Sequence, residues 1–297
     1  MTRLSITVVV PTKNEAANIG KCLSSLTPAA RVLVIDSSST DETAPLAQNL
    51  GAEVIQFKAL QNSPKKRQWA LENAGIETDW TLLIDADEVV PTPLWDEIAR
   101  QVQDANPATG YLVRKGFCFM GRPFRFGGFS HDAVLLFQTG TARFEQLGEQ
   151  AESGLDMEVH ERLIVDGRIA RLKTPLIHED LKGLAAYIDR HNRYSTWEAA
   201  IRHQFLTTGQ WGTESIRPRL FGNVQERRRF LKQFACRIPG EHWLWFLYHY
   251  VGRFGFLEGR AGLIASQMRA QYIANVHAKI AELRLPRRKQ SDFCPNA

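Results

Sequence analysis

Short apolar runs alternate with helical patterns through the first third of the chain. The apolar runs predict strands at residues 6–10, 32–35, 53–57 and 80–84. The stretches between and after them predict helices at 16–26, 41–50, 64–74 and 94–102. Alternation of this kind is typical of a mostly parallel sheet with helices on its faces. The pattern therefore predicts an α/β fold.

The pattern changes after residue 105. Short alternating runs rich in Gly, Phe and Arg across 110–137 predict antiparallel strands added to the parallel sheet. A helical stripe begins near Leu181, and two more follow at 243–257 and 264–283. We expect a main domain at 1–215, with halves at 1–105 and 106–215, and a helical C-terminal region at 216–297.

Composition narrows the class of protein. Of the 297 residues 44% are hydrophobic, which is enough for a globular core. The first residues run into a predicted strand without a signal-peptide pattern, so we expect a cytoplasmic protein. Wide spacing of the cysteines argues against a zinc site or a disulfide framework and favours reduced thiols. They are Cys22, Cys118, Cys236 and Cys294.

Charge is distributed unevenly along the chain. From Arg217 to the end there are 15 Lys and Arg against 5 Asp and Glu, which leaves 22 against 27 for the residues before. The basic C-terminal region also carries aromatic stripes, but its uninterrupted apolar stretch at 243–251 is far shorter than the roughly 20 residues of a membrane span. Two interpretations stay open: ordinary core helices, or helices that lie on an anionic membrane surface.

Polar residues follow three of the predicted strands. Pro11, Thr12, Asn14 and Glu15 follow the first strand, Asp36 ends the second, and Asp85-Ala86-Asp87 follows the fourth. In an open α/β sheet this edge holds the ligand site. Paired carboxylates suit a hard divalent cation and, through it, a diphosphate. A carboxylate such as Asp36 can accept a hydrogen bond from a pyrimidine N–H, although helix capping is the alternative.

These segments resemble the family 2 glycosyltransferases, which have the glycosyltransferase-A fold. The matching motifs are Val9–Glu15, Val34–Asp41 and Leu83–Glu88. The resemblance implies a nucleoside pocket lined by the residues after the first strand and by Asp36. It also implies that Asp87, with Asp85 beside it, holds the diphosphate through Mg²⁺ or Mn²⁺.

The resemblance extends toward bacterial members that add sugars to lipopolysaccharide core and related surface glycans. It implies that Lys66 or Arg67 contacts the diphosphate, with Arg67 in the place of a usual Lys. Glu161 would be the catalytic base, His160 would orient it or assist, and His178 would contact the metal or the diphosphate. Asp132 would bind acceptor hydroxyls, or cap a turn. His131 stands where this family has Pro, which departs from its acceptor-side motif.

We therefore expect a metal-dependent inverting hexosyltransferase. Its donor would be a nucleotide sugar such as UDP-glucose, and its acceptor a hydroxyl of a membrane glycolipid such as lipopolysaccharide core. The enzyme would be peripheral on the cytoplasmic face of the inner membrane. The first alternative is transfer to a polyprenyl phosphate. The second is a nucleic-acid-binding protein, against which the acidic strand ends argue because they would repel a phosphate backbone.

Overall fold

Strand and helix alternate through the N-terminal part of the computed structural model, which describes residues 3–58, 65–145, 162–211, 217–222 and 224–285. The elements here are β1 (Leu4–Thr12), α1 (Ala16–Ser24), β2 (Ala29–Asp36), α2 (Thr43–Asn49), β3 (Glu53–Gln56), α3 (Lys66–Asn73) and β4 (Trp80–Leu83). The four strands are parallel in the order β3-β2-β1-β4. The predicted strand–helix alternation is confirmed.

Strand β1, at the centre of the parallel strands, is buried on both faces. Alternate residues of β1 enter two different hydrophobic clusters: Val8 and Val10 join one, and Val9 joins the other. A strand covered on both faces reads as a continuous apolar run, which explains the sequence of β1. In the register of β1 and β2, Thr12 lies opposite Asp36, so these two strands end together at one edge.

The same sheet continues with strands from later in the chain. They are β5 (Glu88–Val89), β6 (Gly110–Phe119), β7 (Arg122–Pro123), β8 (His131–Gln138), β11 (Ile169–Arg171) and β12 (Leu176–His178). Strand β8 pairs antiparallel with β4 and β6, as the alternating runs predict, and β12 joins β6 to β5. Beside them lie α4 (Thr92–Val102) and a separate pair, β9 (Ala142–Phe144) with β10 (Leu163–Val165).

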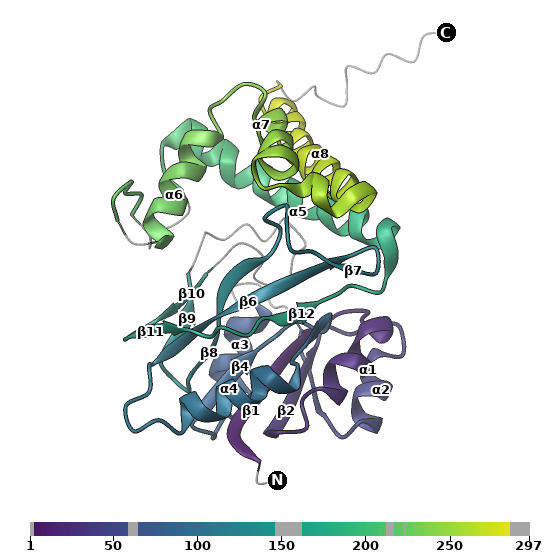
Figure 1. Cartoon of the computed structure of the whole chain (residues 1–297), viewed down its shortest axis with the longest axis vertical. Coiled ribbons are helices and arrows are strands. Elements are labelled where there is room, and N and C mark those ends of the chain that lie inside the picture. The colour runs from purple at the N-terminus through teal and green to yellow at the C-terminus, as the bar shows by residue number, and fades with distance from the viewer. Residues whose placement is uncertain (1–2, 59–64, 146–161, 212–216, 223, 286–297) are drawn as a thin grey trace, which may run out of the picture.

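A layer of helices lies above one end of the sheet (Figure 1). Its elements are α5 (Gly183–Thr208), α6 (Val224–Ala235), α7 (Glu241–Leu247), a π-helical turn η2 (Tyr248–Gly252), a 3₁₀ turn η3 (Gly255–Glu258) and α8 (Gly259–Leu283). Helix α5 packs on α8 around Ala199, Ile273 and Val276. The boundary expected at 215/216 stays a prediction, although α5 lies with the helices that follow it.

Buried charges join the helices of this layer. Arg202 is 2% exposed and reaches Glu198 of its own helix and Glu241 of α7, at 2.9 and 2.7 Å. The hydroxyl of Tyr272 in α8 donates to Glu198, which also pairs with Lys232 of α6. Breaking one partner of a buried pair typically costs about 3–5 kcal/mol because the other charge is left uncompensated. These contacts therefore fix how the helices are placed.

Within the described ranges, the structure contains no helix that is both long and apolar enough to span a membrane.

Candidate functional site

The carboxyl ends of β1 and β2 are held together by the side chain of Asp36. Its carboxylate is buried and accepts hydrogen bonds from the Thr12 hydroxyl, the Ser39 hydroxyl and amide, and the Gln56 amide group. Burial raises the pKa of Asp36, but these hydrogen bonds outweigh it and lower the pKa overall. Four donors match the acceptor capacity of one carboxylate, and the longest contact is that of Gln56 at 3.2 Å.

The loop after β1 is fixed by contacts with the loop after β2. Asn14 has a positive φ of 55°, its amide donates to Ser39 Oγ, and its Oδ1 accepts from the Thr40 amide. Pro11 is buried at the end of the strand. The Glu15 carboxylate lies 2.6 Å from the Lys182 ammonium at the start of α5. The residues predicted around the nucleoside therefore lie at one edge of the sheet.

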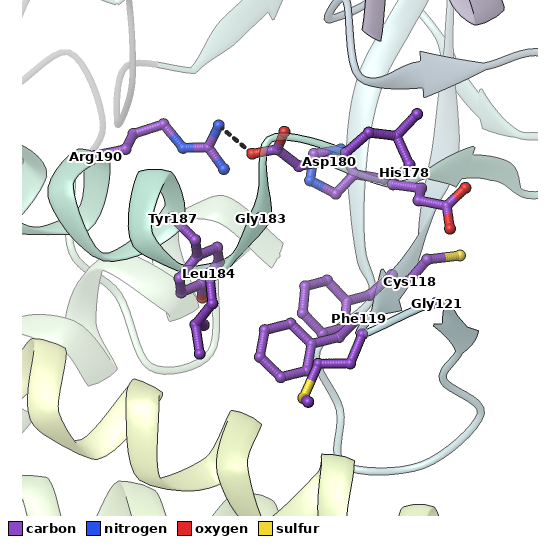
Figure 2. Close-up of a pocket in the computed structure, with 13 residues that line it drawn as sticks. Cys118, Phe119, Gly121, His178, Asp180, Gly183, Leu184, Tyr187 and Arg190 are labelled. Atoms are coloured by element: carbon purple, nitrogen blue, oxygen red, sulfur yellow. Dashed lines mark ion pairs between the residues drawn. The ribbon is translucent and has the colours of Figure 1, made fainter. Parts of the chain in front are cut away.

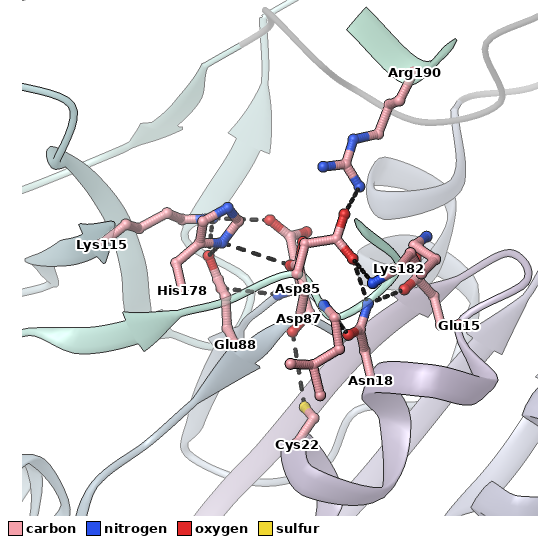
Figure 3. Close-up of polar contacts among 12 residues, drawn as sticks. Glu15, Asn18, Cys22, Asp85, Asp87, Glu88, Lys115, His178, Lys182 and Arg190 are labelled. Atoms are coloured by element: carbon pink, nitrogen blue, oxygen red, sulfur yellow. Dashed lines mark hydrogen bonds and ion pairs between the residues drawn. The ribbon is translucent and has the colours of Figure 1, made fainter. Parts of the chain in front are cut away.

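A compact cluster of opposite charges follows β4 (Figure 3). Its carboxylates belong to Asp85, Asp87 and Glu88, and its cationic or basic side chains to Arg67, Lys115 and His178. Strand pairing assembles this cluster, because β5 and β12 place His178 opposite Glu88. Residues almost a hundred positions apart thus meet at the end of the sheet.

Both oxygens of Asp85 are engaged by cations. Arg67 contacts Oδ1, and Lys115 Nζ lies 2.9 Å from Oδ2. Burial raises the pKa of Asp85, but the two cations outweigh it and hold the pKa well below its ordinary value. The Lys115 ammonium also lies 2.6 Å from Glu88, a residue with no exposed surface. Asp85 is therefore an ionised carboxylate whose charge is compensated by the protein.

Asp87 has a different environment from Asp85. Its Oδ1 lies 3.5 Å from Nδ1 of His178, which is 3.4 Å from Glu88. Burial raises the pKa of Asp87, which the positive charge of His178 partly offsets. Burial alone would lower the pKa of His178, but the Asp87 and Glu88 carboxylates raise it to about 9. Among the described residues, no lysine or arginine lies within ion-pair distance of Asp87, in contrast to Asp85.

The residues present fit a divalent cation that is bound together with a substrate. Within the described ranges, no group of three or more His, Cys, Asp or Glu is placed to hold a metal ion. Asp87 and His178 offer one carboxylate oxygen and one ring nitrogen, and Nδ1 of His178 is too far from either carboxylate for a strong hydrogen bond. Mg²⁺ is commonly held by one or two carboxylates, with substrate phosphates and water completing its shell. A cation would have to displace the proton of His178 to use that nitrogen.

The two basic residues at the start of α3 differ in their positions. Lys66 is 1% exposed and its ammonium donates to the carbonyl oxygen of Thr12 at 2.6 Å. Arg67 contacts Asp85. The structure thus brings Lys66 to the end of β1 and Arg67 to residues 85–88, which we call the acidic turn.

A cavity of about 260 Å³ opens beside His178 (Figure 2). Phe119 and Tyr187 form an aromatic side, with their rings 5.9 Å apart. Asp180 and Arg190 form a polar side and pair at 2.8 Å. An aromatic wall next to paired charges suits a ligand with one apolar and one polar face.

The remaining predicted residues lie elsewhere. Asp132 is on β8 and pairs with Arg171 of β11 at 3.0 Å. Glu161 and His160 lie outside the described residues, so their roles stay predictions.

Sequence reasoning missed Lys115, Glu88 and Arg190 as members of the site. Lys115 is a charged residue on an otherwise half-buried strand, and Glu88 comes directly after the Asp-Ala-Asp turn, so both carried a weak signal. Arg190 lies on a long helix, where a cation is usually solvated. Only the packing of α5 against the sheet shows that it reaches Asp180.

Comparison with known proteins gives the family. Residues 7–150 match the sequence profile of Glycosyl transferase family 2. These residues, just under half of the chain, therefore form a family 2 glycosyltransferase domain. The family and the glycosyltransferase-A fold predicted from the motifs are confirmed, and the C-terminal helical region is present. This family 2 glycosyltransferase is 25% identical to the lipopolysaccharide core biosynthesis glycosyltransferase LpsC of Rhizobium meliloti, over 93% of this chain and 94% of that protein.

Other matches of the family 2 glycosyltransferase are shorter or more distant. An uncharacterized glycosyltransferase of Rickettsia bellii is 39% identical over 33% of this chain and 34% of its own. Glucosyl-3-phosphoglycerate synthase of Mycobacterium tuberculosis, solved with Mn²⁺, UDP and glucosyl-3-phosphoglycerate, is 28% identical over 39% of this chain and 44% of its own, with a TM-score of 0.31. TarS 1-349 of S. aureus is 16% identical over 92% of this chain and 91% of its own, with a TM-score of 0.42.

Proposed function

We propose that this family 2 glycosyltransferase is an inverting, metal-dependent hexosyltransferase. Its donor is a UDP-linked sugar such as UDP-glucose, and its acceptor is a hydroxyl of a membrane glycolipid such as lipopolysaccharide core. One observation carries the proposal: the ends of β1 and β2, the Asp87–His178 pair and the cavity beside it lie along one edge of the sheet. Similarity to LpsC along nearly the whole chain supports the acceptor class.

The nucleoside part of the donor lies over the ends of β1 and β2 in this proposal. Pro11, Thr12, Asn14, Glu15 and Asp36 line its pocket. Because four donors already occupy Asp36, recognition of a uracil N–H requires the weakest of them, Gln56, to move aside. This rearrangement makes Gln56 part of the base-recognition step.

The diphosphate lies at the acidic turn. Asp87 and His178 would hold the divalent cation, which would supply positive charge to the departing diphosphate when bound. Asp85 stays bound to Arg67 and Lys115, so Arg67 acts mainly through Asp85, while Lys66 stands nearer to the nucleoside end. Arg190 adds a further cation near Asp87. The Asp85 cluster therefore fixes the turn, and Asp87 receives the substrate.

The sugar transfer needs a base at the acceptor. We assign this role to Glu161, with His160 as its neighbour. The carboxylate takes the proton of the acceptor hydroxyl while that oxygen attacks the anomeric carbon from the face opposite the diphosphate, which inverts the configuration. We assign Asp132 to acceptor hydroxyls: its Oδ2 pairs with Arg171, and its Oδ1 has no hydrogen-bond partner among the described residues.

Thermal melting with UDP and MnCl₂ tests the donor site. A ligand that binds only the folded chain raises the melting temperature by mass action, by an amount equivalent to about 2.7 kcal/mol at a hundred times its Kd. Asp87→Asn should lose the metal-dependent part of this rise. The control Asp96→Asn, an exposed carboxylate on α4, should keep it. If the metal-dependent rise in melting temperature is unchanged in Asp87→Asn, Asp87 does not hold the cation.

Glu161→Gln separates binding from chemistry. We expect its UDP and Mn²⁺ response to match the unmodified chain, while transfer from UDP-glucose to a lipopolysaccharide acceptor falls at least about a hundredfold, as for loss of a general base. Transfer at the original rate would show that another group takes the proton.

A further inference from the structure

In the segment from Glu241 to Glu258, the side chains of Glu241, His249 and Glu258 are buried against the rest of the protein. Glu241, Trp245 and His249 are spaced by four and lie on the inner side of α7 and η2. Glu241 accepts from Arg202 and from the Trp245 indole, at 2.7 and 2.9 Å. His249 Nδ1 lies 2.6 Å from the carbonyl oxygen of Gly127. This inner side is therefore fixed by hydrogen bonds.

The outer side of the same segment is apolar. Trp243 is 64% exposed, Leu247 and Val251 are each 52% exposed, and Phe254 and Leu257 follow with 55% and 54%. A helix that packs on a protein in water normally has the opposite arrangement, with polar residues outward. Contiguous exposed apolar surface marks an interaction site.

A neighbouring hairpin extends this surface. The Arg125 and Phe126 amides donate to Glu258 at 2.7 and 2.8 Å, and the Gly127 amide donates to the carbonyl oxygen of Arg253. In this hairpin Met120 is 57% and Phe126 40% exposed. We call the exposed apolar side chains of residues 120–126 and 243–257 the apolar face.

Charge around the apolar face has one sign. Neither stretch contains Asp or Glu. The glutamates at the ends of the second stretch, Glu241 and Glu258, are 2% and 5% exposed and accept hydrogen bonds inside the protein. The exposed cations are Arg122, Arg125, Arg253 and Arg260.

We propose that the apolar face docks on a lipid bilayer with anionic headgroups. Exposed Trp and Tyr suit the interface between headgroups and hydrocarbon, and the arginines suit lipid phosphates. A second copy of the chain is a poor occupant, because a two-fold contact brings the same arginine-bearing surface of both copies together, and like charges repel. A bilayer complements both the apolar surface and the positive rim.

Docking also orients the cavity of the active site. Met120 belongs to the apolar face and lines the cavity, so the cavity lies close to the docked surface. This step rests on the proposed function: a lipid-linked acceptor would reach the cavity without leaving the bilayer. The docking itself does not depend on sugar transfer.

Flotation of the full chain with vesicles tests the proposal. We expect binding to vesicles of equal parts phosphatidylcholine and phosphatidylglycerol, and weak binding to phosphatidylcholine alone. Leu247→Glu with Val251→Glu should lower the bound-to-free ratio about tenfold or more. The control is Leu50→Glu at the end of α2, where the residue is 50% exposed and so similar in exposure to Leu247 and Val251. This variant should bind like the unmodified chain.

A charge variant tests the arginines separately. Arg253→Gln with Arg260→Gln should weaken binding to the anionic vesicles and reduce its salt dependence. Circular dichroism melting of every variant establishes folding. The proposal is overturned if the unmodified chain fails to float, if Leu247→Glu with Val251→Glu binds equally well, or if these substitutions instead abolish a dimer in solution. The change in melting temperature with UDP and Mn²⁺ tests the proposed function separately. If this change is absent while vesicle binding is intact, the proposed donor site is rejected and the membrane docking is not.

Discussion

Lys115 is a buried cation shared by two carboxylates. Its side chain is 11% exposed, and the carboxylates of Asp85 and Glu88 raise its pKa against the opposing effect of burial. An ammonium in this position keeps Asp85 ionised and in place. The geometry of the Asp85–Asp87 turn therefore depends on a residue of the next part of the chain.

Lys115→Met should destabilise the protein by about 3 kcal/mol or more, because it leaves buried carboxylates with less compensation. The matched control is Lys21→Met, which removes an ion pair to Glu179 from a lysine whose side chain is 51% exposed and should cost less than about 1 kcal/mol. Urea unfolding of both variants measures the difference. Equal effects would show that Asp85 and Glu88 are compensated without Lys115.

Helix α8 depends on a close approach to the turn before it. A Cβ atom on Gly262 would lie 2.0 Å from the carbonyl oxygen of Gly255 and 2.8 Å from Cβ of Glu258. A side chain cannot fit there unless the backbone moves. This contact sets the direction in which α8 leaves η3, and with it the placement of Glu258 under the hairpin.

Two glycine substitutions in helices should have opposite effects. Gly262→Ala should lower the free energy of unfolding by roughly 1–3 kcal/mol through overpacking. Gly20→Ala in α1, where a Cβ meets nothing within 4 Å, should raise it by up to about 1 kcal/mol because alanine is the better helix former. Chemical unfolding of both variants checks this, and stabilisation by Gly262→Ala would contradict the packing described here.

Elements were easier to predict than the faces that they bury. The sequence shows the stripe Trp243, Leu247, Tyr250, Phe254 and Leu257, but periodicity does not say whether a stripe is core or surface. The answer comes from the opposite side of the segment, where Glu241 meets Arg202 and His249 meets Gly127. Both partners are distant in sequence.

In the candidate site, too, positions along the strands could be predicted but contacts between distant residues could not. Asp36 and Asp87 follow apolar strands, so their place at the sheet edge could be predicted. The contacts of Asp85 with Arg67 and Lys115 could not be predicted from the sequence. The Lys115 contact, for example, depends on which face of β6 lies toward the residues after β4. The roles of Asp132, His160 and Glu161 stay predictions.

At the scale of the whole molecule, His249 is one of the contacts between the helical layer and the rest of the protein, because its Nδ1 meets the Gly127 carbonyl oxygen in the loop before β8. Burial lowers the pKa of this imidazole to about 4, although its hydrogen bond to Gly127 opposes the shift. Its second nitrogen, Nε2, is buried without a hydrogen-bond partner in the described part of the chain. A proton added there would be an uncompensated charge at the joint between the layers.

This joint should make the protein sensitive to mild acid. The folded pKa lies below the unfolded value of about 6.5, so the unfolded chain binds more protons between these values. The contribution of His249 is complete above about pH 6.5 and falls by about 3 kcal/mol as the pH drops to about 4. Urea unfolding at several pH values should show a shallower fall for His249→Phe, and an identical fall would place the sensitivity elsewhere.

The pairing of β5 with β12 has a consequence for the order of assembly. Asp87 is made early during synthesis, but His178 and Lys115 come from strands that are added to the sheet later. A segment that ended before β6 would therefore carry the acidic turn without Lys115 and His178. Under the proposed function, a chain must extend past residue 178 before it can bind the donor, so donor binding would report that β12 has joined the sheet.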